Sequence, residues 1–207
     1  QSKDKRIIIN AFRGVGKSWI TSAYVCHQLL LNPQLNILVV SASKNRADDF
    51  STFTLRLINE IDVLAHLRPS DDQRQSKVSF DVKPARASHA PSVKSLGITG
   101  QLTGSRSDLV IADDVESANN SATMGMRDKL SEQVKEFESI IKPQGRIIFL
   151  GTPQTEMSLY NQLPNRGYKL RVWTARYPTE KQVRNFGDTL APIIRNTWSI
   201  DEQGKPT

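Results

Sequence analysis

The 207-residue chain has only one cysteine, Cys26, so it cannot form an internal disulfide bond. It contains no run of 18 or more apolar residues, and the polar start at residues 1–6 is not followed by the hydrophobic region of a signal peptide, which argues against a membrane span and a signal peptide. Internal repeats and low-complexity tracts are also missing. These absences predict a cytosolic globular chain in which Cys26 lies buried in a helix.

Positive charge is in excess. Lysine and arginine number 28 against 21 aspartates and glutamates, which gives a formal net charge of +7. This excess is compatible with a polyanionic partner such as DNA or RNA, although it is weak evidence without a clustered patch. The length suits one hydrophobic core, alone or with an appendage.

Short β-rich segments alternate with longer helical patterns, which is typical of a parallel sheet with crossover helices. An amphipathic helix is predicted over 44–67 with Ser43 as its N-cap, and a second helix over 120–142 is predicted to end at Pro143. From residue 177 onward the pattern predicts a short helical appendage. Strands are predicted at 6–10, 36–41, 77–82, 108–112, 146–151 and 169–174.

An octapeptide after the first predicted strand, A-F-R-G-V-G-K-S, is similar to the phosphate-binding pattern G-x-x-x-x-G-K-[ST]. It departs from that pattern at its first position, where alanine replaces glycine, and it carries an early arginine. In such a loop backbone N–H groups surround the phosphates, the lysine reaches the β and γ phosphates, and the serine is a ligand of Mg²⁺. An ordinary glycine turn is the alternative. The predicted nucleotide-binding residues are Ala11, Phe12, Arg13, Gly14, Val15, Gly16, Lys17 and Ser18.

A second motif, L-V-I-A-D-D-V-E at 109–116, is an apolar strand that ends in acidic residues. In α/β sheets ligands bind at the carboxyl edge, so these acids are predicted to lie beside the phosphate-binding loop. We expect Asp113 to hold Mg²⁺, and either Asp114 or Glu116 to orient the attacking water. A merely polar turn after the strand is the alternative.

Two further features suit phosphoryl transfer. Thr152 follows a predicted strand in Gly151-Thr152-Pro153 and is expected to form hydrogen bonds near the γ-phosphate, like the sensor residue of motor ATPases. Arg106, in a glycine-rich turn at 99–108, and Arg13 are candidates to stabilise charge on the transferred phosphoryl group. Arg106 would act in cis or on a neighbouring subunit; a salt bridge between Arg106 and Asp108 is the alternative.

The order of four blocks resembles one family: A-F-R-G-V-G-K-S, V-V-S-A-S-K, the long block at 92–116, and L-G-T-P-Q-T-E-M. Over about residues 6–178 the chain is similar to the ATPase domain of the large terminase subunit of tailed bacteriophages, closest to short-tailed podoviruses. The long middle block is far more specific than a Walker motif alone. An early arginine in the Walker A loop is usual in that family, so the departures at Ala11 and Arg13 support the resemblance.

The resemblance implies a P-loop NTPase fold of the additional-strand catalytic-glutamate (RecA-like) type, with a parallel-rich sheet flanked by helices and a small C-terminal helical appendage. It implies an ATPase core at 1–178 and a lid or linker subdomain at 179–207 that leads to a nuclease domain absent from this chain. Endonuclease activity is therefore expected only from that missing domain. Asp113 and Asp114 match the Walker B acids, where the usual Asp-Glu pair here reads Asp-Asp and Glu116 follows.

The implied function is ATP-driven and Mg²⁺-dependent translocation of double-stranded DNA into a procapsid. The partners implied are the portal protein, the small terminase subunit and further copies of the chain in a ring, expected to be a pentamer. The protein would act in the host cytoplasm, dock transiently on the procapsid and be absent from the mature virion. Residues 83–94 are predicted to form an exposed basic loop that, with Lys44 and Arg46, is a candidate for DNA contact.

Two other functions are open at this point. A helicase or remodelling ATPase of the same nucleotide-binding class would have a second RecA-like core. A binding module with a loop that does not hydrolyse nucleotide is less favoured, because the lysine, the serine and the acids are all present.

Overall fold

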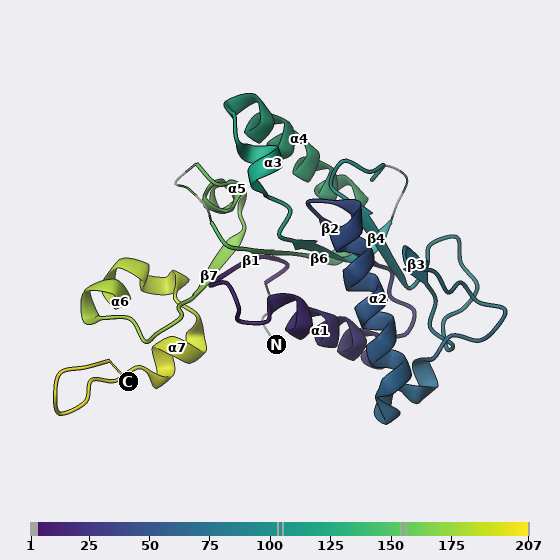
Figure 1. The fold of residues 1–207 in the computed structure, drawn as a ribbon, viewed down its shortest axis with the longest axis horizontal. Helices are drawn as coiled ribbons and strands as arrows, with labels where there is room; N and C mark the ends of the chain where they lie inside the picture. Colours follow the sequence, from purple (N-terminus) through teal and green to yellow (C-terminus); the bar gives the residue numbers. More distant parts are fainter. Residues whose placement is uncertain (1–3, 103, 105, 154, 156, 207) are drawn as a thin grey trace.

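The computed structural model describes residues 4–102, 104, 106–153, 155 and 157–206; Thr103 and Ser105 of the predicted turn, and Gln154 and Glu156 of the last motif, lie outside this range. A seven-stranded sheet with the order β3-β4-β2-β5-β6-β1-β7 forms its centre (Figure 1). Neighbouring strands are parallel except for β3 and β4. The strands are β1 (Arg6–Ala11), β2 (Ile37–Ser41), β3 (Ser79–Phe80), β4 (Val93–Gly97), β5 (Ser107–Asp113), β6 (Ile141–Gly151) and β7 (Lys169–Trp173).

The strand order confirms the predicted fold class. Strand β6 lies between β1, which leads into the glycine-rich loop, and β5, which ends in the acids. This is the additional strand expected for the RecA-like type. In the observed register Asp113 lies beside both Ser41 and Leu150, and Asn10 lies beside Gly151. The carboxyl ends of four central strands therefore meet at one edge of the sheet.

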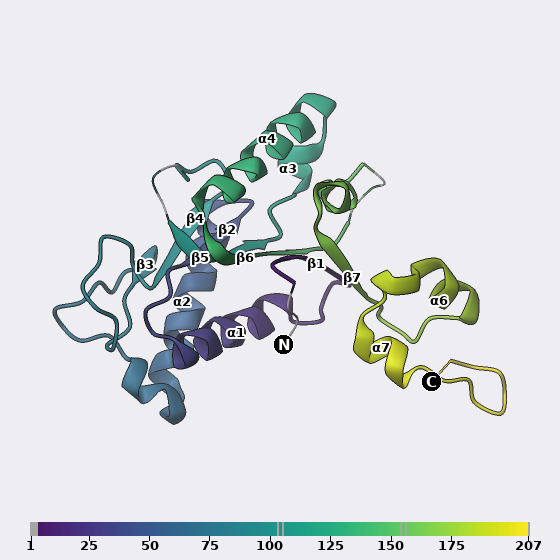
Figure 2. The ribbon, with the colours of Figure 1, turned by 180° about the vertical axis from the view of Figure 1, so that it is seen from behind.

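Helices cover both faces of the sheet, α1 and α2 on one face and α3, α4 and α5 on the other (Figures 1 and 2). Successive residues of a strand enter opposite cores: Ile37 and Val39 face the α1 and α2 side, and Leu38 and Val40 face the α4 side. Both faces are covered, so the strands read as continuous apolar runs. The helices are α1 (Lys17–Leu31), α2 (Lys44–Glu60), η1 (Asp62–Leu67), α3 (Ala118–Ser121), α4 (Met124–Ile140), α5 (Leu159–Gln162) and η2 (Leu163–Arg166).

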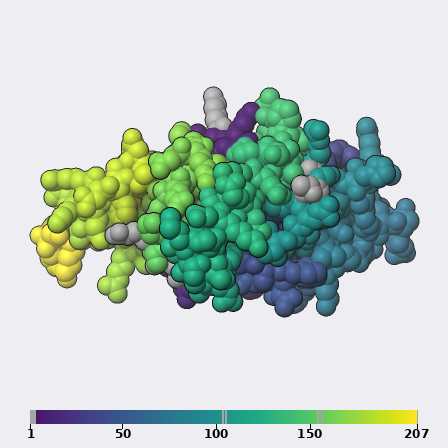
Figure 3. Space-filling model, turned by 90° about the horizontal axis from the view of Figure 1, so that it is seen from above, coloured from purple at the N-terminus to yellow at the C-terminus, as the bar shows by residue number. Residues whose placement is uncertain are grey.

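The C-terminal residues form the helical appendage that the sequence predicts, with α6 (Glu180–Phe186), η3 (Gly187–Thr189) and α7 (Pro192–Thr197). They lie beyond β7 at one end of the elongated molecule, in yellow in Figure 3. Leu190 is fully buried, and the Ala191 N–H donates to the Val172 carbonyl at 2.9 Å. These contacts attach the appendage to the sheet edge, while its division from the core at 178/179 stays a prediction.

The sequence prediction around β3 and β4 is wrong. The predicted strand at 77–82 contains only the short β3, and β4 includes Lys94, which was expected in an exposed loop. The buried positions of β4 are Val93, Ser95 and Gly97. Serine and glycine are not apolar side chains, so the sequence lacks the alternation of apolar and polar residues that predicts a strand. Glycine is required at 97 because a Cβ there would lie 2.8 Å from the backbone nitrogen of Lys44, where α2 packs.

The two long helices also differ from their predicted extents. Ser43 caps α2 as predicted, accepting from the Arg46 N–H, but α2 ends at Glu60 and extended backbone at Ile61 separates it from η1. The second helix is two helices, α3 and α4, and it ends at Ile140, not at Pro143, because the chain enters β6 there.

Cys26 lies buried in α1, as the sequence predicts. None of the helices in the described part of the chain is both long and apolar enough to cross a membrane.

Candidate active site

The glycine-rich loop connects β1 to α1 and has the backbone of an anion-binding turn. Gly14 and Gly16 have φ values of 84° and 78°, in the left-handed region that glycine adopts most easily. Gly16 is the N-cap of α1 and supplies no side-chain hydrogen bond to the helix. The first N–H groups of α1 are therefore available to a phosphate, and the positive end of the helix favours one.

The Lys17 side chain spans the loop and reaches the end of β6. Its Nζ donates to the carbonyl oxygens of Ala11 and Phe12, both at 3.3 Å, and to Thr152 Oγ1 at 3.0 Å. The Thr152 hydroxyl in turn donates to the Ala11 carbonyl at 2.8 Å. The structure thus brings together the lysine and the threonine that the sequence singled out from motifs 135 residues apart.

A second contact joins the loop to the end of β5. Ser18 Oγ donates to Asp113 Oδ2 at 3.0 Å. Burial raises the pKa of Asp113; the Ser18 hydrogen bond opposes this shift, and the nearby Asp114 carboxylate adds to it. The other carboxylate oxygen, Oδ1, is buried and has no hydrogen-bond partner within the described residues. A hydroxyl beside an unsatisfied carboxylate oxygen fits a hard cation such as Mg²⁺, which prefers oxygen ligands.

Asp114 occupies a turn between the strand end and the cavity. It has a φ of 46°, unusual for a residue other than glycine, and its N–H donates to the Leu150 carbonyl at 2.9 Å. It faces a cavity of about 750 Å³ at the carboxyl edge of the sheet. Eight predicted site residues line this cavity, namely Arg13, Gly14, Gly16, Lys17, Ser18, Asp114, Glu116 and Thr152.

Glu116 lines the same cavity, but its carboxylate is bound on the protein side. One oxygen, Oε2, accepts from Ser158 Oγ at 2.5 Å and from the Leu159 N–H at 3.0 Å. Both Glu116 and Ser158 are buried. The two carboxylates that the sequence could not separate, Asp114 and Glu116, therefore have different surroundings.

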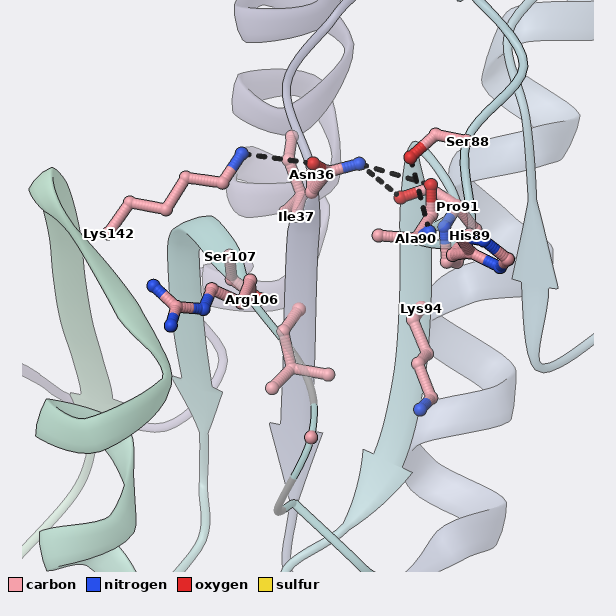
Figure 4. Close-up of a pocket in the computed structure, with 12 residues that line it drawn as sticks. Asn36, Ile37, Ser88, His89, Ala90, Pro91, Lys94, Arg106, Ser107 and Lys142 are labelled. Carbon is pink, nitrogen blue, oxygen red and sulfur yellow. Dashed lines mark hydrogen bonds between the residues drawn. The ribbon is translucent and has the colours of Figure 1, made fainter.

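Arg106 does not join this group within one chain. It precedes β5, while Asp113 ends it, and a strand of seven residues separates them by roughly 20 Å. The predicted role in cis is thus incompatible with this arrangement. Arg106 lies in a cavity of about 440 Å³ at the opposite edge of the sheet, near Lys94 and Lys142 (Figure 4).

The alternative salt bridge between Arg106 and Asp108 is also not formed. In the described structure Asp108 accepts from the Lys142 ammonium at 2.7 Å and from the Asn36 N–H at 2.9 Å. The same ammonium donates to the Asn36 side-chain oxygen (Figure 4). Lys142 therefore replaces Arg106 as the partner of Asp108.

The structure adds Arg46 to the site. Arg46 was predicted to contact DNA, yet it lines the 750 Å³ cavity and an adjoining cavity of about 390 Å³ that includes Asp113 and Trp19. Its charge lowers the pKa of Asp113. A signal was present in the sequence, because a helix that starts just after β2 begins at the same sheet edge as the loop. Lys44, the other predicted DNA contact on α2, pairs with Asp48.

Comparison with known proteins agrees with this geometry. Residues 8–160 match the family model described as terminase large subunit, T4likevirus-type, N-terminal. The chain belongs to the terminase large-subunit family. This terminase chain is 52% identical, over 211 aligned positions, to the large terminase subunit of Enterobacteria phage T3. The alignment covers 99% of the chain but 36% of that relative, so the terminase chain spans about a third of the length of the relative.

Solved structures share the fold of this terminase chain. The N-terminal domain of the DNA packaging ATPase from bacteriophage phi29 has a TM-score of 0.51 at 13% identity, covering 82% of the chain and 87% of that domain. Dbp5 of Saccharomyces cerevisiae, in a complex with Nup159 and ADP, has a TM-score of 0.52 at 10% identity, covering 87% of the chain and 46% of Dbp5. At these identities the similarity concerns the fold alone.

Proposed function

We propose that this terminase domain hydrolyses ATP and that hydrolysis drives double-stranded DNA into a procapsid. The observation that carries the proposal is the pair of 3.0 Å contacts from the glycine-rich loop, Lys17 to Thr152 and Ser18 to Asp113. They join three strand ends around one cavity, and family membership supports the packaging function. The portal, the small terminase subunit and the ring of copies belong to the same proposal.

The residues divide into roles by position. Backbone N–H groups of the loop and the Lys17 ammonium bind the phosphates, while Arg13, exposed at the cavity, stabilises charge on the γ-phosphate. Ser18 and Asp113 would hold Mg²⁺, which offsets the negative charge of the phosphate oxygens when bound. Asp114 orients the attacking water, because one oxygen of the Glu116 carboxylate, Oε2, is engaged by Ser158 and Leu159.

Arg106 acts on the nucleotide of a neighbouring subunit in this proposal. Its position at the far edge of the sheet leaves it no phosphate to contact within its own chain. In a ring, that edge of one subunit would face the loop of the next. Hydrolysis would then depend on assembly.

DNA is held by contacts that do not read the base sequence, and these are expected to weaken as salt rises. Lys83, Arg86 and Lys94, on or next to the exposed segment before β4, are the candidates. The C-terminal residues 179–207 would act as the lid or linker that leads to the nuclease domain. The protein would work in the host cytoplasm while docked on the procapsid.

The catalytic part is tested by ATP hydrolysis in the Lys17→Ala variant, with Lys129→Ala as the matched control. Lys129 is exposed on α4, away from the cavity, so its variant should hydrolyse ATP like the unchanged protein. Equal rates in both variants would contradict the proposed site.

The role of Arg106 is tested by mixing subunits. Rings of Arg106→Ala alone, or of Lys17→Ala alone, should be inactive, while mixed rings should regain part of the activity because some interfaces join an intact loop to an intact arginine. No rescue in mixed rings that demonstrably assemble would leave Arg106 a structural role.

The helicase alternative has no observation in its favour. The similarity to Dbp5 is one of fold, at 10% identity, whereas the family model matches residues 8–160.

A further inference from the structure

A buried hydrogen-bond cluster links the segment after β5 to the segment after β6. The Glu116 Oε2 atom accepts from Ser158 Oγ and from the Leu159 N–H, so it caps the first turn of α5 from outside the helix. Ser158 has 0% exposure and Leu159 has 4%. In the described structure the Glu116 carboxylate is the acceptor for both of these buried donors, and leaving a buried donor without a partner is costly.

Tyr160 forms the second half of this link. The Glu116 N–H donates to the Tyr160 hydroxyl at 3.4 Å, and the Tyr160 ring packs against Gly151 at the end of β6. The ring has 1% exposure. Backbone and side chain of Glu116 therefore both contact the region 158–160.

The link holds two site residues at a fixed separation. Asp114 lies two residues before Glu116, and Thr152 directly follows the glycine on which Tyr160 packs. Both residues line the 750 Å³ cavity. If Thr152 moved relative to Asp114, the contacts between Glu116 and residues 158–160 would have to break, or the segment 158–160 would have to move with Thr152.

We propose that Glu116 is a positioning residue that ties the strand end bearing Asp114 to the segment that continues from Thr152 into α5. The inference deepens the proposed ATPase function and rests on it. A movement of Asp114 or Thr152 that follows hydrolysis at the γ-phosphate would then be transmitted through the Glu116 contacts to α5, η2 and β7, the last strand before the C-terminal appendage. Glu116 does not itself activate water in this proposal.

Three variants of the protein test this role: Glu116→Gln, Glu116→Ala and Ser158→Ala. The amide oxygen of glutamine accepts from both buried donors, whereas alanine leaves both unsatisfied. We expect kcat for ATP to fall about 5- to 150-fold in Glu116→Ala and to be largely rescued, to within about 5-fold, in Glu116→Gln. The dissociation constant for ATP should stay within about 2-fold, because the glycine-rich loop is untouched.

Ser158→Ala separates positioning from water activation. Ser158 is fully buried, so a loss of kcat in Ser158→Ala supports the link. The double variant Glu116→Ala/Ser158→Ala should be no slower than Glu116→Ala alone, since both substitutions remove the same hydrogen bond between Ser158 and Glu116. Glu136→Gln, an exposed change on α4, is the matched control, and thermal unfolding checks that each variant is folded.

Two results would overturn the inference. If Glu116→Gln lost roughly 10²- to 10⁴-fold, as much as Glu116→Ala, while Ser158→Ala hydrolysed ATP normally, Glu116 would be the water-orienting residue. If all three variants matched the control, the link would have no role in turnover. Both results leave ATPase activity in the unchanged protein, so they are distinct from a failure of the proposed function, which would show as no Lys17-dependent hydrolysis at all.

Discussion

Replacement of Gly151 by alanine should be strongly destabilising, because the Tyr160 ring occupies the space where the alanine Cβ would lie. A Cβ built at Gly151 would lie less than 3.0 Å from three ring carbons of Tyr160, whereas carbon atoms in contact prefer about 3.5–4.0 Å. The Tyr160 ring is buried in the core on the α4 side and cannot move outward. The Gly151 φ is not positive, so crowding alone, without backbone strain, causes the effect.

The expected size follows from the cost of overpacking. Inserting one methyl group into a packed core costs about 1–3 kcal/mol, and contact with three ring atoms places Gly151→Ala near about 3 kcal/mol. For a chain of this length 1 kcal/mol corresponds to about 2–4 °C, so Tm should fall by about 6–12 °C. Gly125→Ala is the matched control, since no atom lies within 4 Å of its Cβ and alanine favours the helix.

Thermal unfolding followed by circular dichroism measures both variants. A double variant sharpens the assignment: in a Tyr160→Leu background, which lacks the ring, Gly151→Ala should cost far less than in the unchanged protein. If Gly151→Ala had the same Tm as the unchanged protein, or lost as much stability in the Tyr160→Leu background, the reasoning from the Tyr160 contact would be refuted.

Three further predictions concern the site and its surroundings. Asp114→Asn should retain ATP binding, measured by fluorescent nucleotide, and lose roughly 10²-fold or more in kcat; near-normal turnover would remove Asp114 from the mechanism. Burial raises the pKa of Asp113, so ionisation of this carboxyl lowers the free energy of unfolding as pH rises from 3.8 through the folded-state pKa. Asp113→Asn should therefore be more resistant to urea than the unchanged protein at pH 7 without nucleotide. This gain in stability should vanish near pH 3, where Asp113 is protonated. Burial also raises the pKa of Cys26 to about 11, so a thiol reagent at pH 8 should label it only after unfolding, and fast labelling of the native protein would contradict the buried position.

The sequence predicts the central strands and the site they carry because both depend on local patterns. Runs such as residues 37–40 and 109–112 are apolar throughout, which is typical of strands that are covered on both faces. Parallel strands end at one edge, so Lys17, Asp113 and Thr152 could be expected together from their places after three strands.

What the sequence does not reveal depends on contacts between distant segments. The sequence does not predict strand β4, because its buried position 97 is a glycine and not an apolar side chain. Glycine is needed there because α2 packs against it, and this contact is known only from the folded chain. The difference between Asp114 and Glu116 depends on Ser158, 42 residues beyond the glutamate. Arg106 is close to Asp113 in sequence but far in space, because an extended strand lies between them.

The backbone at Asp114 explains an unusual choice of amino acid. Glycine, asparagine and aspartate adopt a positive φ at low cost, whereas longer side chains do so rarely, so a glutamate at a φ of 46° would strain the turn. The aspartate that stands where the family usually has glutamate therefore suits the local conformation, and in the proposed function its shorter side chain would require a closer approach of the attacking water. In the proposed function the Asp-Asp pair would therefore combine a positive φ at position 114 with a side chain one methylene shorter than that of the usual glutamate.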